Sequence, residues 1–564
     1  MNSNKMKASE TSIRNLLEGT KQFQVPLFQR PYSWKKSHWD TLWDDLMSIY
    51  NEEVEGSYFL GPIVTQSISA TADGISPFLI IDGQQRLTTL SILLASLRDK
   101  LKNANKKRVS DELHEFYLIN KFKDNEDYFK VLPTQADRDS YKALIDRENS
   151  LSHLNLNGQI TKAHEYFIKK LNNQGIDFCD KIKNIILEKL IVVNITSGED
   201  DNPYLIFESL NNKGQELTQA DLVRNYIFMK LPLESREKEY NCLWLPLENK
   251  FKEQVGEKYS GELTNSFWFY LRKEGKSVSK NNIYQSFKKK CDNSSDGLQE
   301  ELELLVKFSQ YYECLNFPET EESNSMLKNY FNNLKKLDFT TSHIFLLNIY
   351  NDYQNSQISK DDFEKILIYL ESYFVRRLFS GVSTRVLGGI LNNLYKDIQK
   401  ENTGDIVQRL YEILNRFENQ KRWPTDEEFK QGIINHNIYS QKTAGRTQFI
   451  LERLEKSQGK ETVDFSNLTV EHIMPQTLSN QWKKTLGEKN AKNYKTWLHT
   501  LGNLTLTAYN PELSNKPYFD KQKYLIDSNL YLNRYFRDIN DWNFDEIKER
   551  GNRLADIAIK VWPR

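Results

Sequence analysis

The chain has 564 residues, which excludes a single small binding module and leaves room for roughly three or four domains. Its 77 basic and 77 acidic residues give a formal net charge of zero, so no global field attracts polyanions and any nucleic-acid contact must come from local patches. The four cysteines are far apart and form no CxxC pair, which argues against a disulfide framework and against a thiolate zinc site.

This cysteine usage fits a reducing, cytoplasmic setting. The N-terminal residues are polar, and no apolar run approaches the roughly 20 residues that a membrane helix needs, so we expect no membrane contact. The composition leaves the oligomeric state open, including a homo-oligomer.

Three short apolar runs near the N-terminus predict strands: VPLF at 25–28, YFLGPIVTQSI at 58–68 and SPFLIID at 76–82. From Leu87 to Leu101, leucines recur at helical spacing. The third strand is therefore expected to lead directly into an amphipathic helix.

The run KLIVVNI at 189–195 predicts a further strand. Residues 203–228 predict a helix, a glycine-containing turn and a second helix, with Thr218 and Asp221 as the capping box of the second helix. From 231 to about 430 the chain is rich in Lys and Glu, with aromatic residues and leucines three and four apart, which predicts a helical connecting domain. The expected domains are 1–230, 231–430 and 431–564.

The segment IIDGQQRLTTL, residues 80–90, joins the third strand to its helix. Gly83 permits a tight turn, and the free amides of a helix N-terminus attract phosphate. Arg86 adds a planar, permanently charged fork, Gln84 and Gln85 can donate amide hydrogens, and Asp82 could position a water or a metal. An ordinary capped junction between strand and helix is the alternative.

The segment FQRPYSW, residues 28–34, combines Gln29 and Arg30 with the aromatic rings of Tyr32 and Trp34. A phosphate-seeking charge beside aromatic surfaces suits DNA binding and the sensing of an altered group on DNA. Two alternatives stay open: the rings are core residues beside the first strand, or Arg30 serves the phosphate-attracting site at the start of the helix after Gly83.

Near the C-terminus, LTVEHIMPQTL at 468–478 places Glu471 and His472 next to each other on a short strand that ends by Pro475. Adjacent side chains on a strand project to opposite faces, so one can ligate a metal while the other reacts. A neutral imidazole can take a proton from water, and a carboxylate oxygen is a ligand for a hard cation that polarises a phosphate.

Further oxygen donors follow in HTLGNLTLTAYNPELSNK, residues 499–516. LTLT predicts a short strand, and the break at Asn510 precedes a helix-like run, which gives a ββα outline. Asn503 and Asn510 can each ligate a hard cation or fix a loop through hydrogen bonds.

The ordered motifs EHIMPQ and LGNLTLTAYNPELSNKPYFDK resemble the His-Me finger (HNH, ββα-metal) nuclease domain of GmrSD-type modification-dependent restriction enzymes. The resemblance implies that His472 is the general base, Glu471 the acidic metal ligand and Asn503 the asparagine that supports the His loop. It implies Asn510 as the third motif position and metal ligand, with Asn515 as the competing candidate. Lys516 and Lys521 would be placed to meet DNA phosphates.

The motifs VPLFQRPYSW, YFLGPIV and DGQQRLTTL resemble the ParB/sulfiredoxin-like N-terminal domain of the same enzymes, and FESLNNKGQELTQADLVRN resembles its distal motif. This resemblance implies a nucleotide site with hydrolysis at five consecutive residues, Asp82, Gly83, Gln84, Gln85 and Arg86. Asn211 and Asn212 are weaker additions. In phosphorothioate-sensing SspE-like relatives the FQRPYSW region is implicated in recognising modified DNA.

These resemblances imply an α+β multidomain protein that is predominantly helical, with a ParB-like α/β N-terminal domain, a helical middle and a ββα-metal nuclease domain. The expected function is a nucleotide-regulated endonuclease that requires Mg²⁺ or Mn²⁺ and restricts modified phage DNA. The expected partners are modified double-stranded DNA and a nucleoside triphosphate. Two alternatives stay open: an inactive or regulatory DNA-binding defence protein, and an NTPase-coupled RNA nuclease.

Overall fold

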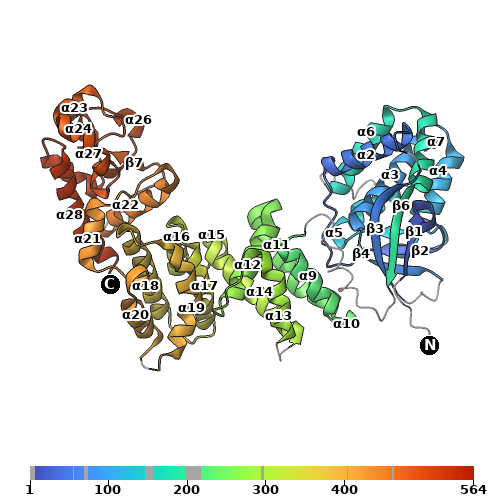
Figure 1. Ribbon diagram of the computed structural model, residues 1–564, viewed down its shortest axis with the longest axis horizontal. Helices are drawn as coiled ribbons and strands as arrows, with labels where there is room; N and C mark the ends of the chain where they lie inside the picture. The colour runs from blue at the N-terminus through green and yellow to red at the C-terminus, as the bar shows by residue number, and fades with distance from the viewer. Residues whose placement is uncertain are drawn as a thin grey trace. The chain divides into compact units, whose positions relative to one another are not determined.

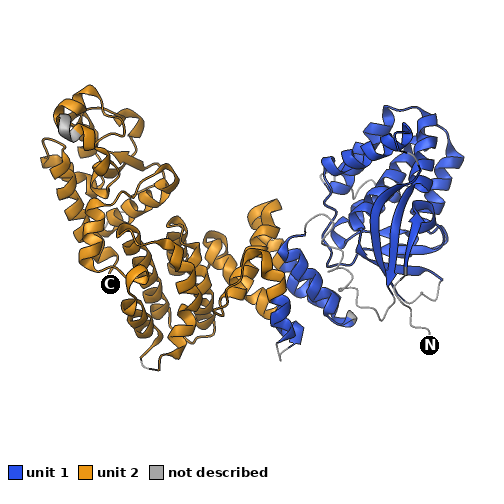
Figure 2. Ribbon diagram, viewed as in Figure 1, with its two compact units in different colours: residues 1–246, 287–302 blue, residues 247–286, 303–564 orange. Residues whose placement is uncertain are grey.

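The computed structural model describes residues 7–54, 56–68, 74–146, 158–197, 217–293, 297–402, 404–459 and 463–564. It divides into two compact units (Figure 2). Unit 1 comprises residues 1–246 with 287–302, and unit 2 comprises residues 247–286 with 303–564. Both units contain a segment distant in sequence from the rest, so no single point of the chain separates them.

A six-stranded mixed sheet forms the centre of unit 1 (Figure 1). In spatial order its strands are β1 (Lys7–Ser12), β6 (Leu190–Ser197), β3 (Tyr58–Ser67), β4 (Ser76–Asp82), β2 (Lys21–Gln24) and β5 (Val131–Leu132). The pairs β3–β6, β2–β4 and β2–β5 are parallel, whereas β1–β6 and β3–β4 are antiparallel.

Among the described residues up to 197, the α-helices around this sheet are α1 (Ile13–Leu17), α2 (Lys36–Tyr50), α3 (Gln84–Asn103), α4 (Lys107–Leu113), α5 (Gln135–Ile145), α6 (Gln159–Asn172) and α7 (Ile176–Asn184). The leucines of α3 from Leu87 to Leu101 are buried in one core with the inward faces of α2, α6 and the sheet. Because α3 begins directly after β4, this core fixes the position of the junction that carries Gly83.

The strands predicted at 58–68, 76–82 and 189–195 are confirmed as β3, β4 and β6. The strand predicted at 25–28 is wrong, because β2 ends at Gln24. The Val25 amide still donates to the Leu132 carbonyl at 2.8 Å, but Pro26 has no N–H with which to continue the ladder.

The helix predicted after Thr218 is confirmed as α9 (Gln219–Lys230). Its capping box is present, since the Thr218 hydroxyl accepts from the Asp221 amide at 3.2 Å and the Asp221 carboxylate accepts from the Thr218 amide at 3.2 Å. Residues 198–216, which include the predicted first helix of this pair, lie outside the described residues.

The described residues between 231 and 430 form helices and turns without a strand, as the sequence predicts. The α-helices of this region that lie wholly in unit 2 are α12 (Tyr259–Arg272), α15 (Pro318–Glu321), α16 (Ser325–Lys336), α17 (His343–Gln354), α18 (Lys360–Phe379), α19 (Leu387–Lys400), α20 (Ile406–Arg416) and α21 (Asp426–Asn435). Together with unit 1 they make the molecule a predominantly helical α+β protein.

The C-terminal part of unit 2 contains a two-stranded antiparallel ribbon of β7 (Thr469–His472) and β8 (Leu504–Thr507). Three short helices connect the strands: α23 (Asn480–Leu486), α24 (Glu488–Asn493) and α25 (Lys495–Leu498). After β8 come α26 (Asn510–Leu513), α27 (Tyr518–Ile526) and α28 (Phe544–Val561). Two strands followed by helices agree with the expected outline, while its identification as a ββα-metal fold stays a prediction.

This ribbon is attached to the helical region on two sides. Helix α28 packs against α21 and α22 (Ala444–Gln458), and Gly502 lies so close to α28 that an added Cβ would meet the Ile547 carbonyl oxygen. Beyond α28, the Trp562 carbonyl accepts from Nε of the fully buried Arg376 of α18 at 2.8 Å. The ribbon is therefore built into unit 2 by contacts from residues far apart in the sequence.

Candidate functional site

Glu471 and His472 occupy the last two positions of β7, opposite Thr505 and Leu504 of β8. Both are buried, with exposed fractions of 4% and 5%. Because neighbouring residues on a strand face opposite sides, the carboxylate and the imidazole have separate surroundings.

The ring of His472 contacts two other rings, those of His499 and Tyr439. His472 Nε2 and His499 Nδ1 are 3.0 Å apart, which is a hydrogen bond whose direction depends on the tautomers. Tyr439 lies edge-to-face against His472, with ring centroids 4.6 Å apart, and stacks on His499 at 5.6 Å. Burial, the neighbouring His499 and the charge of Lys521 lower the pKa of His472 to about 3, so this imidazole is neutral at pH 7.

Asn503 fixes the loop that follows His472. Its carboxamide oxygen accepts from the Met474 amide at 2.8 Å and from the Trp542 indole at 3.0 Å. Its amide group donates to the carbonyls of Met474 and Leu498 at 3.0 and 2.8 Å. With every polar atom of this fully buried side chain satisfied, Asn503 can support the loop but has no oxygen available for a metal.

Glu471 forms an ion pair with Lys521 of α27. The Lys521 ammonium lies 2.5 Å from the Glu471 carboxylate and donates to the His472 carbonyl at 2.8 Å. Burial raises the pKa of Glu471 and lowers that of Lys521, and the attraction between the two charges opposes both shifts. The expectation that Lys521 meets a DNA phosphate is wrong, because its side chain is completely buried.

The two candidate asparagines differ in their surroundings. Asn510 is half-buried and donates from its amide group to the Thr469 hydroxyl at 3.1 Å and to the Val470 carbonyl at 3.0 Å, beside Glu471 on β7. Asn515 is exposed. The structure thus brings Asn510, and not Asn515, against the strand that carries Glu471.

The side chains around Glu471 do not fit a divalent cation bound to its carboxylate. The carboxylate already has a buried ammonium as its counter-charge, so the pair has no net charge with which to attract a metal. No cluster of three or more His, Cys, Asp or Glu side chains that could hold a metal occurs in the described ranges.

The second predicted site lies where β4 meets α3 in unit 1. Gly83 has a φ of +94° and precedes the first turn of α3, and a Cβ there would lie 3.0 Å from the Pro62 carbonyl oxygen. Arg86 donates to that same carbonyl at 2.5 Å and to Asp82 at 3.3 Å. At Gly61, with a φ of +117°, a Cβ would lie 3.1 Å from the Arg86 guanidinium, so both glycines allow close approach here.

Three buried polar atoms near the start of α3 have no hydrogen-bond partner among the described residues: Ser33 Oγ, Gln84 Oε1 and Arg86 Nε. Gln84 is only 8% exposed. Buried donors and acceptors are normally satisfied, so such a group beside a helix N-terminus fits a polar, phosphate-bearing ligand. Gln84 and Arg86 with the first amides of α3 would hold it.

Gln85 has a different role from its neighbours. Its carboxamide oxygen accepts from the Ser33 amide at 2.8 Å and its amide group donates to the Pro31 carbonyl at 3.2 Å. It therefore attaches the FQRPYSW segment to the start of α3.

The four residues predicted to sense DNA are not equally accessible. Tyr32 is buried, with its hydroxyl 2.6 Å from Thr89 Oγ1 and accepting from the Trp39 indole at 2.9 Å. Gln29 is also buried and donates to the Ile81 carbonyl at 3.3 Å. A buried Tyr32 ring cannot contact DNA directly in this structure. Tyr32 is instead a core residue, as the alternative interpretation of the sequence expected.

Arg30 and Trp34 are half-buried, and Trp34 stacks on His38 with centroids 5.6 Å apart. These two remain the accessible part of the segment. Asn211 and Asn212 lie outside the described residues.

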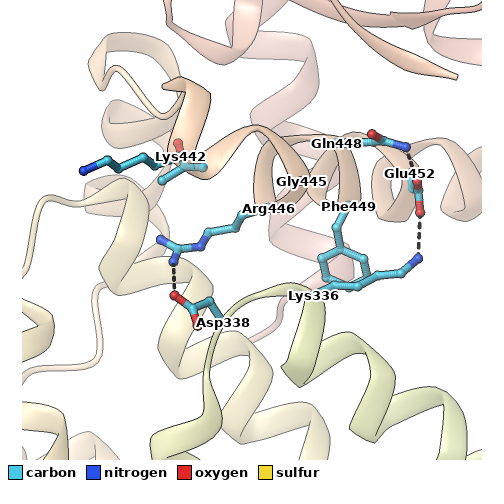
Figure 3. Close-up of a pocket in the computed structure, with 9 residues that line it drawn as sticks. Lys336, Asp338, Lys442, Gly445, Arg446, Gln448, Phe449 and Glu452 are labelled. Carbon is cyan, nitrogen blue, oxygen red and sulfur yellow. Dashed lines mark hydrogen bonds and ion pairs between the residues drawn. The ribbon is translucent and has the colours of Figure 1, made fainter. Parts of the chain in front are cut away.

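One cavity of unit 2 lies apart from these sites, at the start of α22 (Figure 3). It has a volume of about 400 Å³. Its basic side chains face carboxylates: Arg446 lies 3.4 Å from Asp338, and Lys336 lies 3.3 Å from Glu452. Because two of its three basic side chains are paired with carboxylates and it contains no predicted site residue, it is not assigned to the active site.

Two residues of the His472 cluster were not identified from the sequence, namely His499 and Tyr439. His499 opens the HTLGN stretch that was singled out for Asn503, which is the one local signal for it. Tyr439 is 33 positions before His472 and is brought there through the backbone bond from the Ile438 amide to the His499 carbonyl.

Comparisons with known proteins match an N-terminal and a C-terminal region of the chain. The family model described as the GmrSD restriction endonuclease N-terminal domain matches residues 13–228, and the one described as the GmrSD restriction endonucleases C-terminal domain matches residues 423–557. An uncharacterized protein of Methanocaldococcus jannaschii is 24% identical over 255 residues, which are 39% of this chain and 41% of that protein. The chain thus matches about two fifths of that relative's length. None of the described helices combines the length and apolar character needed to cross a membrane.

Proposed function

Because this chain belongs to the GmrSD restriction endonuclease family, we propose that it is a nucleotide-regulated DNA endonuclease that restricts modified foreign DNA. The observation that carries the proposal is the presence of both family domains in order on one chain, with His472 and Asn503 inside the second. The hydrogen bonds of Asn503 to the loop after His472 support it further, since a general base needs a fixed position.

In the proposed reaction the His472 imidazole takes a proton from the water that attacks the DNA phosphate. For this, Nε2–H must donate to His499 Nδ1, which leaves the lone pair of His472 Nδ1 as the base. The attacking oxygen then bonds to phosphorus, and the bond from phosphorus to the sugar oxygen breaks; that oxygen leaves with the electron pair and takes a proton from solvent. The negative charge of a bound phosphate would raise the pKa of His472 from its low value in the free protein towards the neutral range.

The expected requirement for Mg²⁺ or Mn²⁺ stays a prediction. Glu471 is engaged by Lys521 and Asn503 is satisfied, so this reaction scheme assigns no step to a cation. Asn510 and Asn515 remain the candidate ligands.

Regulation by a nucleoside triphosphate is supported by the start of α3. The unpartnered atoms of Gln84 and Arg86 beside the turn at Gly83 suit a ligand with phosphate oxygens and polar groups. Arg86 with the first amides of α3 would bind the phosphates, and Gln84 would hydrogen-bond another part of the nucleotide.

The direct test is digestion of matched DNA that is unmodified, glucosylated at hydroxymethylcytosine or phosphorothioated, with and without each NTP. We expect cleavage of at least one modified DNA and a dependence on NTP. No cleavage of any DNA, or cleavage of RNA alone under the same conditions, would favour the alternatives of a regulatory DNA-binding protein or an RNA nuclease.

A further inference from the structure

Lys521 and Glu471 form an almost completely buried ion pair next to His472. The exposed fractions of the two side chains are 0% for Lys521 and 5% for Glu471. A lysine is almost never fully buried unless its charge is paired, so this arrangement requires a carboxylate at position 471.

The Lys521 ammonium makes two contacts on successive residues of β7. It lies 2.5 Å from Oε1 of Glu471 and 2.8 Å from the backbone oxygen of His472. A divalent cation bound to Glu471 would have to enter beside a buried positive charge, which Coulomb repulsion opposes strongly in a poorly solvated site.

The same two contacts hold α27 against the strand. Since the His472 ring lies on the opposite face from Glu471, Lys521 cannot touch the reacting atoms from this side. Its bond to the His472 carbonyl instead fixes the backbone from which the imidazole extends.

We infer that Lys521 is the resident cation of Glu471: its ammonium, and not a divalent metal, neutralises the carboxylate and positions the end of β7 that carries His472. Only the test that measures catalysis rests on the proposed nuclease function. Glu471 is then a positioning residue, and any metal that the reaction needs is held through other ligands and the DNA phosphate.

The first test measures Mn²⁺ binding to the full chain without DNA, by the loss of the free Mn²⁺ electron paramagnetic resonance signal. We expect Glu471→Gln and the wild type to bind Mn²⁺ equally, within about twofold, as should the exposed control Glu512→Gln. A loss of about tenfold or more in Glu471→Gln alone would overturn the inference, because it would make Glu471 a metal ligand.

The second test is a double-mutant cycle on thermal unfolding. Lys521→Met and Glu471→Gln should each lower the Tm, and the double variant should recover part of that loss because neither unpaired charge remains buried. Additive losses would overturn the pairing. If Lys521→Met does not fold, the Mn²⁺ measurement on Glu471→Gln still decides.

The third test separates positioning from metal binding in nicking assays. We expect Glu471→Gln to lower kcat while the Mn²⁺ concentration for half-maximal nicking stays unchanged; a shift of about tenfold in that concentration would contradict the inference. If the wild type cleaves no DNA, the proposed function fails, whereas the binding and unfolding tests still decide the role of Lys521.

Discussion

His472 and His499 share one hydrogen bond, and its direction decides whether His472 can act as a base. If His499 accepts, Nδ1 of His472 keeps its lone pair; if His499 donates, Nδ1 carries the proton of the neutral ring. The half-buried His499 is therefore a positioning residue that selects the tautomer of the more buried His472.

Replacing His499 by Phe keeps a planar ring against Tyr439 but removes the hydrogen bond. We expect kcat for DNA nicking to fall by about tenfold to hundredfold with little change in KM, because the base loses its tautomer and not its substrate. His499→Asn, which keeps a polar side chain, should recover part of the rate. Equal rates for His499→Phe and the wild type would show that the imidazole pair has no role in the chemistry.

A second residue-scale prediction concerns Glu313 on α14 (Gly297–Asn316), both of whose carboxylate oxygens are buried without a hydrogen-bond partner in the described structure. Burial is the main cause that raises its pKa from 4.5 to about 8, opposed by Lys250 and reinforced by Glu321. The folded protein therefore holds a proton that the unfolded chain releases above pH 4.5, so this group's contribution to stability is present below pH 4.5 and is lost as the pH rises to 8.

Glu313→Gln should remove that loss. At pH 7 we expect the urea unfolding transition of unit 2 to shift to higher stability by on the order of 2 kcal/mol, with a smaller gain at pH 5. Glu303→Gln, an exposed change on the same helix, is the control and should have little effect. If the stability gain of Glu313→Gln does not increase with pH, the Glu313 carboxyl is not buried in its protonated form.

At the residue scale, the sequence predicted the roles of individual side chains better than it predicted which residues those side chains contact. Asn503 was expected to support the His loop, and its hydrogen bonds are compatible with that role. By contrast, the burial of Lys521 against Glu471 depends on how α27 packs on β7, which no local pattern encodes. Tyr32 illustrates the same limit, because an aromatic residue beside an arginine has the same sequence pattern in a core as on a binding surface.

At the scale of elements, the turn between β4 and α3 is the feature on which the nucleotide site depends. Gly83→Ala would force a side chain into a φ of +94° and bring its Cβ 3.0 Å from the Pro62 carbonyl oxygen. We expect a stability loss of about 1 to 3 kcal/mol and weaker NTP binding, measured by equilibrium titration.

Gly19→Ala is a matched control for this change. Gly19 has a similar φ of +83°, but an added Cβ meets nothing within 4 Å. It should show backbone strain alone and leave NTP binding intact. If both variants bind NTP as the wild type does, the turn at Gly83 does not form the nucleotide site.

Periodicity located β3, β4, β6, β8 and α3, because their apolar residues alternate or recur with the pattern of their element. It failed at VPLF, where the apolar run continues but Pro26 ends the ladder. The short helices between β7 and β8 were not anticipated, since 31 residues separate the two strands and their polar sequence carries weak periodicity.

At the scale of the whole molecule, the chain was predicted as three consecutive domains, which stays a prediction; each of its two compact units consists of two segments that are separate in the sequence. Residues 287–302 belong to unit 1 although residues 247–286 belong to unit 2. The contact of Trp562 with Arg376 likewise joins the last residues to a helix of the middle region. Because contacts of this kind join residues far apart in the sequence, the unit boundaries are not marked by a stretch of linker-like composition that the sequence could reveal.

The proposed function requires that the nucleotide site in unit 1 influences cleavage at His472 in unit 2, which is a coupling between two sites. Arg86→Ala should abolish NTP turnover and the effect of NTP on nicking, while the exposed control Arg108→Ala should retain both. Unchanged NTP turnover in Arg86→Ala would place the nucleotide site elsewhere, and lost turnover with unchanged NTP-dependent nicking would separate hydrolysis from regulation.

The role of His472 is tested most directly by plasmid nicking with His472→Ala beside His436→Ala, an exposed histidine in the same unit, in Mg²⁺ or Mn²⁺ with NTP and modified DNA. We expect His472→Ala to lose nicking while keeping its fold and DNA retention, and His436→Ala to cut at the wild-type rate. Undiminished cleavage by His472→Ala would contradict the assignment of His472 as the base.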